Sequence, residues 1–372
     1  MRVLVLNPGS SSLKGSLVET PGNRTLADEE VDWGADATAN AGRRSGMAGL
    51  VGRLTTHAFP EAVGYRVVHG GHHFREPTLV DDEVVAAIDD LAALAPLHNA
   101  VAAETIRAGR ELLPDLPHVA CFDTAFHAGL PEAAWRYPLP ADWVEAHGFR
   151  RFGFHGLSVA WSVARAPALL DKPVETLRLV VAHLGSGCSV TAVAGGRSVA
   201  TSMGFTPLEG LMMGSRAGSV DPGILLHLLR AGVNIDELAD GLDHRSGLVG
   251  VAGSTGGVRE LEAASAAGDA RAELALDMFA RRAAAGIADA ATSLDRLDAV
   301  VFTGGIGTNS VRVRADVTGR LGVLGVPMVA GVAGEDARLS EPGARVAVLR
   351  VEAREDLAIA PQVAQVVESP PG

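Results

Sequence analysis

Short apolar runs alternate with stretches of helical periodicity along the first third of the chain. The runs predict buried strands at 3–6, 62–69 and 118–122. Residues 81–94 and 100–113 place apolar side chains at helical spacing, and the first of these helices begins with carboxylates. Residues 20–59 are poor in large apolar side chains, so we predict no element there.

The same alternation continues to the end of the chain. Further strands are predicted at 177–182, 190–194, 298–303 and 344–351, and further helices at 225–231, 235–242, within 258–294, and at 358–367. Strands that alternate with helices indicate an α/β fold. A chain of 372 residues exceeds what one core usually supports, so we expect two domains.

Two tight turns between predicted strands resemble each other. They are NPGSSSL (7–13) and HLGSGCSV (183–190), and each has a polar residue, a spacer, Gly-Ser and small residues before the next strand. The likeness predicts two related halves that each present a small-residue hairpin to a shared cleft. A chance similarity between two tight hairpins is the alternative.

The first turn has the chemistry of a phosphate site. Small residues let backbone N–H groups approach an anion, Ser10 and Ser12 add hydroxyl donors, and Lys14 adds a compact positive charge. The chain has only two lysines, Lys14 and Lys172, and otherwise uses arginine, which favours a specific need for an ammonium here. The alternative is an ordinary solvated turn.

Composition and charge exclude several classes of protein. The chain is 47% apolar and 20% charged, with a net charge of −12, which argues against nucleic acid or an anionic membrane as the main partner. The uncharged span 179–196 is rich in Gly and Ser, so a strand-turn-strand is favoured over a membrane helix. Cys121 and Cys188 lie in apolar surroundings, and without a signal peptide we expect buried thiols and a cytoplasmic protein. The GxGxxG and GxxxxGK[ST] fingerprints are absent, which excludes Rossmann and P-loop sites.

Nine stretches together resemble the acetate kinase family, within the sugar kinase, Hsp70 and actin superfamily. They occur in family order and leave only 20–59 uncovered: LNPGSSSLK (6–14), RVVHGG (66–71), PLHN (96–99), FDTAFH (122–127), FGFHGLS (152–158), HLGSG (183–187), MGFTPLEGLMMGSRAGSVDPG (203–223), FTGGIGTNS (302–310) and EAREDLAIA (352–360).

The resemblance implies a fold and a reaction. The fold would be two ribonuclease-H-like (actin-like ATPase) domains flanking a catalytic cleft. An acyl- and phosphate-binding domain would comprise 1–149 plus the helix 357–368, and a nucleotide-binding domain would comprise 150–356. The reaction would be ATP + acetate ⇌ ADP + acetyl phosphate with Mg2+ or Mn2+, carried out by a homodimer. Two anions must meet in it, so cations and neutral donors should converge from both domains.

The family's roles, carried over by position, give a catalytic set. Arg66 and Arg216 would hold the carboxylate and the phosphoryl group, and His155 and His183 would donate to phosphoryl oxygens. Asp123 matches an essential carboxylate. A substrate acid with a pKa near ~4 is already ionised at neutral pH, so we expect Asp123 to orient Mg2+ or its water rather than act as a base.

The remaining roles form three groups. Metal would be held by Asn7 and Glu355, usually through water, and Asp356 could not face the same ion as its neighbour Glu355. The acyl group would contact Val68, Leu97, His98, Phe154 and Pro207. The nucleotide and its phosphates would contact Ser10, Ser12, Lys14, His183, Gly185, Ser186, Gly187, Arg259, Gly305, Ile306, Gly307, Thr308 and Asn309.

Departures from the family pattern fall mostly on the nucleotide side. Ser186 replaces an Asn, Gly257 replaces an Asp, and Thr308 replaces a Glu, so the preferred phosphoryl donor stays open. The segment MGSRAGS (213–219) loses a carboxylate near Arg216. His69, His72 and His73 lack standard metal spacing and are interpreted as solvated loop residues.

Two alternative functions remain. Propionate or butyrate kinase would keep the chemistry, and one methylene shifts binding by only ~1–3 kcal/mol. A non-catalytic ATP-dependent clamp is the alternative of another class, and Arg66, Asp123 and Arg216 argue against it.

Overall fold

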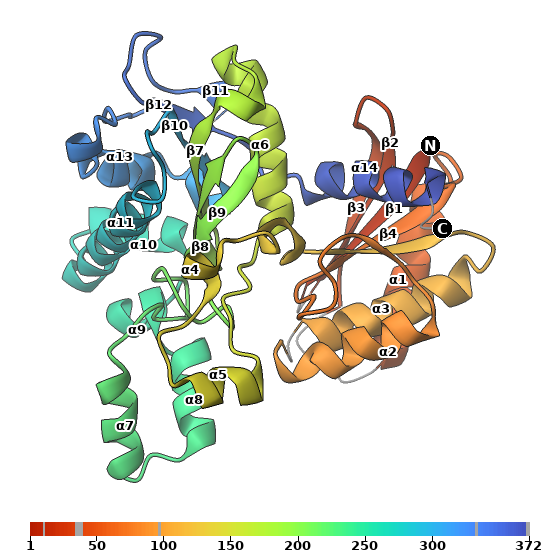
Figure 1. Cartoon of the computed structure of the whole chain (residues 1–372), viewed down its shortest axis with the longest axis horizontal. Helices are drawn as coiled ribbons and strands as arrows, with labels where there is room; N and C mark the ends of the chain where they lie inside the picture. Colours follow the sequence, from red (N-terminus) through yellow and green to blue (C-terminus); the bar gives the residue numbers. More distant parts are fainter. Residues whose placement is uncertain (10–11, 34–39, 96–97, 332–333, 370–372) are drawn as a thin grey trace. The chain divides into compact units, whose positions relative to one another are not determined.

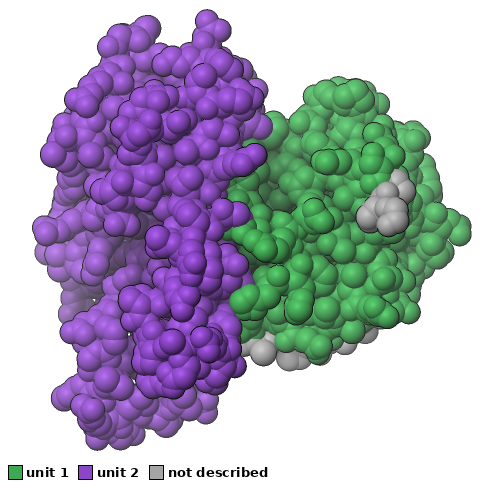
Figure 2. Space-filling model, viewed as in Figure 1, with its two compact units in different colours: residues 1–128, 154–161, 354–372 green, residues 129–153, 162–353 purple. Residues whose placement is uncertain are grey.

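The computed structural model describes residues 1–9, 12–33, 40–95, 98–331 and 334–369. Two compact units make up the chain (Figures 1 and 2). Unit 1 comprises Met1–Ala128, Phe154–Trp161 and Arg354–Gly372, and unit 2 comprises Gly129–Gly153 and Ser162–Ala353. The expected domain boundaries stay a prediction, and these units differ from them at 129–149, 154–161 and 354–356.

Unit 1 is built on a six-stranded sheet with the order β3-β2-β1-β4-β6-β5. Its strands are β1 (Arg2–Pro8), β2 (Ser12–Glu19), β3 (Arg24–Asp32), β4 (Ala62–Val67), β5 (Thr78–Leu79) and β6 (His118–Phe122). The first three strands form an antiparallel meander, and β4 and β6 run parallel to β1. The parallel strands therefore end at one edge of the sheet, where Asp123 follows β6.

Helices cover both faces of this sheet, which explains why its central strands are continuously apolar. Leu4 and Leu6 pack into a core with α1 (Asn40–Thr55), α2 (Asp82–Asp90) and α3 (Asn99–Leu112). Val3 and Val5 pack instead against α14 (Glu355–Glu368). Gly64 lets α14 approach β4, because a Cβ there would lie 2.7 Å from Val363 and 2.8 Å from Ile359.

Unit 2 repeats the same strand order. Its sheet runs β11-β12-β10-β7-β8-β9, from β7 (Arg178–Leu184), β8 (Cys188–Ala194), β9 (Arg197–Thr201), β10 (Ala299–Thr303), β11 (Ala337–Arg338) and β12 (Ala347–Arg350). An antiparallel three-strand meander is again followed by two parallel strands and an antiparallel edge strand. The match confirms the two related halves predicted from the hairpins, and the α/β class with two ribonuclease-H-like sheets.

The helices of unit 2 lie in two groups. Those that accompany the sheet include α11 (Ala270–Ala291), which lies against β7 and β8, with α9 (Gly247–Ala252), α10 (Val258–Ala266), α12 (Gly304–Asn309) and α13 (Val311–Gly319). Helix α4 (Glu132–Trp135) lies against β9, and the others are α5 (Ala141–His147), α7 (Pro222–Arg230) and α8 (Ile235–His244). Residues 156–161 of α6 (Gly156–Leu170) belong to unit 1, and its later residues belong to unit 2.

Most of the predicted helices and strands are confirmed, with exceptions in residues 20–59. Two elements, β3 and α1, occupy the segment where none was predicted. Asp221 caps α7 by accepting a hydrogen bond from the Gly223 N–H. His69 is buried, so its interpretation as a solvated residue is wrong, whereas His72 and His73 are exposed. In the described part of the chain, no helix combines the length and apolar character needed to cross a membrane.

Candidate functional site

The centre of the site in unit 1 is an ion pair between Arg66 and Asp123. Arg66 projects from β4, and Asp123 follows the neighbouring strand β6. Arg66 Nη2 donates to Asp123 Oδ2 at 2.7 Å, and its Nε contacts both carboxylate oxygens at 3.2 Å. The Asp123 side chain is only 1% exposed, whereas that of Arg66 is 18% exposed. The buried carboxylate therefore fixes a guanidinium fork that ligands can still reach.

Asn7 and Glu355 extend this pair into a network. Arg66 Nη1 donates to Asn7 Oδ1 at 3.2 Å, and Asn7 Nδ2 donates to Glu355 Oε2 at 3.0 Å. Asn7 lies near the end of β1, and Glu355 is the first residue of α14. Residues separated by more than 300 positions are thus brought together at one edge of the sheet.

Charge and burial act against each other in this network. Burial raises the pKa of the Asp123 carboxyl, and the Arg66 guanidinium opposes that rise. Burial alone would lower the pKa of Arg66, but the Asp123 and Glu355 carboxylates reverse the direction and raise it. Arg66 therefore stays charged, and it supplies the positive charge that an anionic substrate needs.

The backbone around His155 is arranged to reach Asp123. His155 has φ +58°, and the N–H of the next residue, Gly156, donates to the Asp123 carbonyl at 2.9 Å. A Cβ on Gly156 would lie 2.1 Å from that carbonyl oxygen, so only glycine fits. The backbone N–H of His155 also donates to the Asp123 carboxylate, which lowers its pKa.

A carboxylate from outside the predicted phosphate turn, that of Glu30, contacts two residues of the predicted site. Ser12 Oγ donates to Glu30 Oε1 at 2.9 Å, and Lys14 Nζ lies 3.9 Å from Glu30 Oε2. Glu30 lies on β3, which the sequence did not predict, and it belongs to no motif. Lys14 and Glu30 are more than half exposed, so this pairing is weak and a phosphate could replace it. Ser10 lies outside the described residues.

Three described residues of the predicted acyl pocket, Val68, His98 and Phe154, belong to unit 1, and their assembly into a pocket stays a prediction. Phe154 is buried and meets the ring of His69 edge-on at 5.3 Å. Val68 directly precedes His69 and is half-buried, and His98 stands at the start of α3. Leu97 lies outside the described residues. Pro207 belongs to unit 2, so its place in this pocket stays a prediction.

In unit 2, two predicted nucleotide segments lie together. Gly304 has φ +76°, and a Cβ there would lie 2.6 Å from the Leu184 carbonyl oxygen. The strand pairing also sets His183 opposite Thr303. Residues 183–187 and 304–309 therefore meet at the carboxyl ends of β7 and β10, where open α/β sheets bind their ligands. The predicted nucleotide residues Gly305, Ile306, Gly307, Thr308 and Asn309 all lie in α12.

Arg216 lies beside the first of these segments. The neighbouring Gly214 N–H donates to the Ser186 carbonyl at 3.1 Å. Burial raises the pKa of the Cys188 thiol to about 12, and the charge of Arg216 acts in the opposite direction. Asp243, on α8, lies 3.7 Å from Arg216, so another part of the chain supplies a carboxylate where the segment 213–219 has none. Arg259, in the first turn of α10, is exposed.

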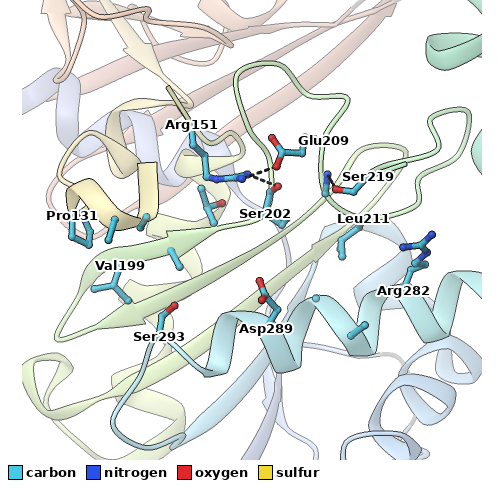
Figure 3. Close-up of a pocket in the computed structure, with 17 residues that line it drawn as sticks. Pro131, Arg151, Val199, Ser202, Glu209, Leu211, Ser219, Arg282, Asp289 and Ser293 are labelled. Carbon is cyan, nitrogen blue, oxygen red and sulfur yellow. Dashed lines mark hydrogen bonds and ion pairs between the residues drawn. The ribbon is translucent and has the colours of Figure 1, made fainter. Parts of the chain in front are cut away.

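The segment that carries Pro207 is tied down by residues that no prediction named. Glu209 accepts a hydrogen bond from Tyr137 and another from Arg151, and Figure 3 shows the bond from Arg151. Tyr137 in turn accepts one from the Phe205 N–H at 2.8 Å. A cavity of about 790 Å3 borders this cluster, and none of the predicted site residues lines it.

The donor set in unit 1 fits a magnesium ion. Asn7 Oδ1 and the Glu355 carboxylate are the oxygen ligands that Mg2+ prefers, and Mg2+ typically uses one or two carboxylates together with water and phosphate oxygens. Within the described ranges, no cluster of three or more His, Cys, Asp or Glu residues could hold a metal.

Comparisons with known proteins cover nearly the whole chain. The sequence model of the Acetokinase family matches residues 2–361. An acetate kinase of Synechococcus sp. is 46% identical over 394 residues, covering 97% of this chain and 98% of the relative. An acetate kinase of Deinococcus deserti is 46% identical over 398 residues, covering 100% of this chain and 99% of the relative.

Solved structures agree with the sequence comparisons. The crystal structure of Porphyromonas gingivalis acetate kinase matches with a TM-score of 0.88 at 33% identity, over 98% of this chain and 99% of that one. A propionate kinase from Francisella tularensis matches with a TM-score of 0.87 at 32% identity, with the same coverage. The full-length matches and the shared fold show that this chain belongs to the acetokinase family, whose members are kinases that phosphorylate a carboxylate.

Proposed function

We propose that this protein is an acetate kinase, which transfers the γ-phosphoryl group of ATP reversibly to acetate and needs Mg2+. The observation that carries the proposal is the Arg66–Asp123 pair with Asn7 and Glu355 beside it, in a chain that matches acetate kinases over its full length. Arg66 donates to Asp123 and Asn7 through three of its N–H groups, so two of its five remain for a substrate carboxylate.

The electrostatics of the reaction explain the residue types. A carboxylate and a triphosphate repel each other, and the loose transition state spreads negative charge over the phosphoryl oxygens. Arg66 would hold the acetate, and Arg216, His155 and His183 would neutralise the phosphoryl group in transit. Lys14 and Ser12 would bind phosphate after giving up Glu30.

The metal would bind at Asn7 and Glu355. When bound, Mg2+ would neutralise phosphate charge and orient the phosphates of the nucleotide. Asp123 would orient the ion's water through its own ion pair with Arg66, and it has no proton to remove from an ionised acid.

Trapping the product with hydroxylamine tests the proposal. The purified protein is incubated with acetate, Mg2+ and hydroxylamine, with ATP, GTP or pyrophosphate as phosphoryl donor, and acetohydroxamate is measured. We expect hydroxamate with at least one donor, and no hydroxamate when Mg2+ is chelated. A lack of product with all three donors would rule out the kinase and favour the non-catalytic clamp.

The acyl group could be larger than acetate. The likeness to the Francisella tularensis propionate kinase is nearly as strong as that to the Porphyromonas gingivalis acetate kinase. Values of kcat/KM for acetate, propionate and butyrate decide among them. We expect acetate to have the highest value, and a higher value for propionate or butyrate would reassign the substrate.

We further propose that the protein forms homodimers in the cytoplasm. Helices α7 and α8 have no buried residues, and several of their large apolar side chains are more than 40% exposed: Ile224, Leu226, Leu229 and Ile235. An apolar surface of this kind on a helix pair indicates a protein contact. The free, buried thiols of Cys121 and Cys188 fit a reducing compartment.

A further inference from the structure

Two buried arginines lie against the helix that carries the predicted nucleotide segment. Arg314, in α13, is 0% exposed, and Arg350, the last residue of β12, is 5% exposed. Arginine is rarely buried to this degree without a charged partner. The family resemblance gave neither residue a role.

Both guanidinium groups bind the carbonyl end of α12. The Thr308 carbonyl accepts from Arg314 Nη1 at 2.8 Å and from Arg350 Nε at 3.0 Å. Arg314 Nη1 also donates to the Gly307 carbonyl at 3.0 Å, and its Nη2 donates to the Gly331 carbonyl at 2.8 Å. The last carbonyls of a helix have no partner within it, so these bonds fix the end of α12.

The two positive charges are not neutralised nearby. Among the described residues, neither arginine has a carboxylate within ion-pair distance, and their hydrogen bonds go to backbone carbonyls. Arg314 Nε and Arg350 Nη1 are buried without a hydrogen-bond partner. Buried charge without a counter-ion is costly, and a bound anion would reduce that cost.

We propose that Arg314 and Arg350 are positioning residues of the nucleotide site. They hold the carbonyl end of α12 in place, and their net charge of two favours a polyphosphate at the other end of the helix, where Gly304 and Gly305 meet residues 184–185. The inference rests on the proposed nucleotide-binding role of residues 305–309.

A purely structural role makes a different prediction. If the arginines only hold α12 in place, their loss should weaken every ligand of this segment alike, including adenosine, which carries no charge. If their charge also acts on the ligand, the loss should weaken ADP much more than adenosine.

Isothermal titration of ADP and adenosine separates the two roles without any turnover. The variants are Arg350→Gln, which removes the charge, and Arg350→Lys, which keeps it. Arg338→Gln is the matched control, since Arg338 also donates to two backbone carbonyls, those of Glu341 and Pro342, but on β11. Thermal unfolding of each variant checks that the fold is kept.

We expect Arg350→Gln to raise the Kd of ADP roughly five- to tenfold, at the low end of ordinary coupling between two sites, and that of adenosine less than twofold. Arg350→Lys should keep the wild-type ratio of ADP to adenosine affinity. If Arg350→Gln does not fold, Arg314→Gln removes the other charge and should show the same selective loss of ADP affinity. Arg338→Gln should bind both ligands as the wild type does.

Three results would overturn the inference: unchanged ADP affinity in Arg350→Gln, an equal loss for both ligands, or a changed ratio in Arg350→Lys. The proposed function fails separately. A wild type that binds ADP but yields no hydroxamate refutes the kinase and leaves the inference standing, whereas a wild type that does not bind ADP refutes the inference.

Discussion

Arg66 shows how single residues in this protein depend on distant parts of the chain. Its guanidinium is held by Asp123 and Asn7, which come from two other strands of the same sheet. A solvated arginine would sample many rotamers, whereas this one is held in a single fork geometry. The preorganised fork reduces the ordering that substrate binding would otherwise require.

His127 provides a pH test at the same scale. Burial lowers its pKa to about 4, although its hydrogen bond to the Phe154 carbonyl, at 3.1 Å, acts in the opposite direction. The unfolded chain therefore binds a proton at His127 from about pH 6.5 downward and the folded chain only near pH 4, so stability falls as the pH drops through this window.

We expect His127→Gln to reduce that loss of stability. Glutamine can still donate to the Phe154 carbonyl but does not titrate. Between pH 7 and pH 5, the free energy of unfolding should fall by about 2 kcal/mol more in the wild type than in the variant, measured by urea denaturation. Equal losses in the two proteins would show that His127 is protonated normally in the folded state.

Among the elements, the sheets were predictable and some of their neighbours were not. Strands such as β4 and β10 are buried on both faces of their sheets, so their sequences are mostly continuous apolar runs, which predict strands. Strand β3 is half exposed and rich in carboxylates, and α1 contains four glycines, so neither has a strong pattern. Glu30 was missed for this reason, because its contact with Lys14 depends on β3 pairing with β2.

The candidate site was predictable to a similar extent. Arg66 and Asp123 follow from motifs at the ends of adjacent strands, and the structure brings them together. Arg314 and Arg350 could not be predicted, because their importance lies in burial and in a missing counter-ion, which depend on packing rather than on any sequence pattern.

The contact of α14 with the sheet of unit 1 gives a test at this scale. Gly64→Ala would place a methyl group 2.7–2.8 Å from the branched side chains of Val363 and Ile359, which cannot move away easily. We expect a loss of about 1–3 kcal/mol in the free energy of unfolding.

Gly52→Ala, in α1, is the matched control. Apart from the backbone of α1 itself, no atom of the described residues lies within 4 Å of its added Cβ. Alanine also favours helix, so this change should leave stability unchanged or raise it. If Gly64→Ala were as stable as the wild type, the close contact between β4 and α14 would be wrong.

At the scale of the whole molecule, the apolar faces of α7 and α8 need a partner. Ile235 is 73% exposed, and Ile235→Glu would place a charge in the proposed dimer contact. A two-fold interface contains the substitution twice, and each copy should weaken the free energy of dimerisation by about 2 kcal/mol or more. Sedimentation velocity should show a dimer for the wild type and mostly monomer for this variant.

Val323→Glu is the control for this prediction, because Val323 is 88% exposed in another part of unit 2. The control should remain dimeric. A dimer that persists in Ile235→Glu would place the contact elsewhere, and a monomeric wild type would refute the homodimer.

The central claim is that Arg216 neutralises negative charge on the transferring phosphoryl group, and Arg216→Ala tests it most directly. The rate of acetohydroxamate formation is measured at saturating ATP and acetate, with Arg245→Ala, an exposed neighbour paired with Asp240, as control. The account predicts that Arg216→Ala lowers kcat roughly 100- to 1,000-fold in a folded protein, which is the usual effect of removing one hydrogen-bond donor to a transition state in an enzyme. The control should keep wild-type turnover. Near-normal turnover in folded Arg216→Ala would contradict the account.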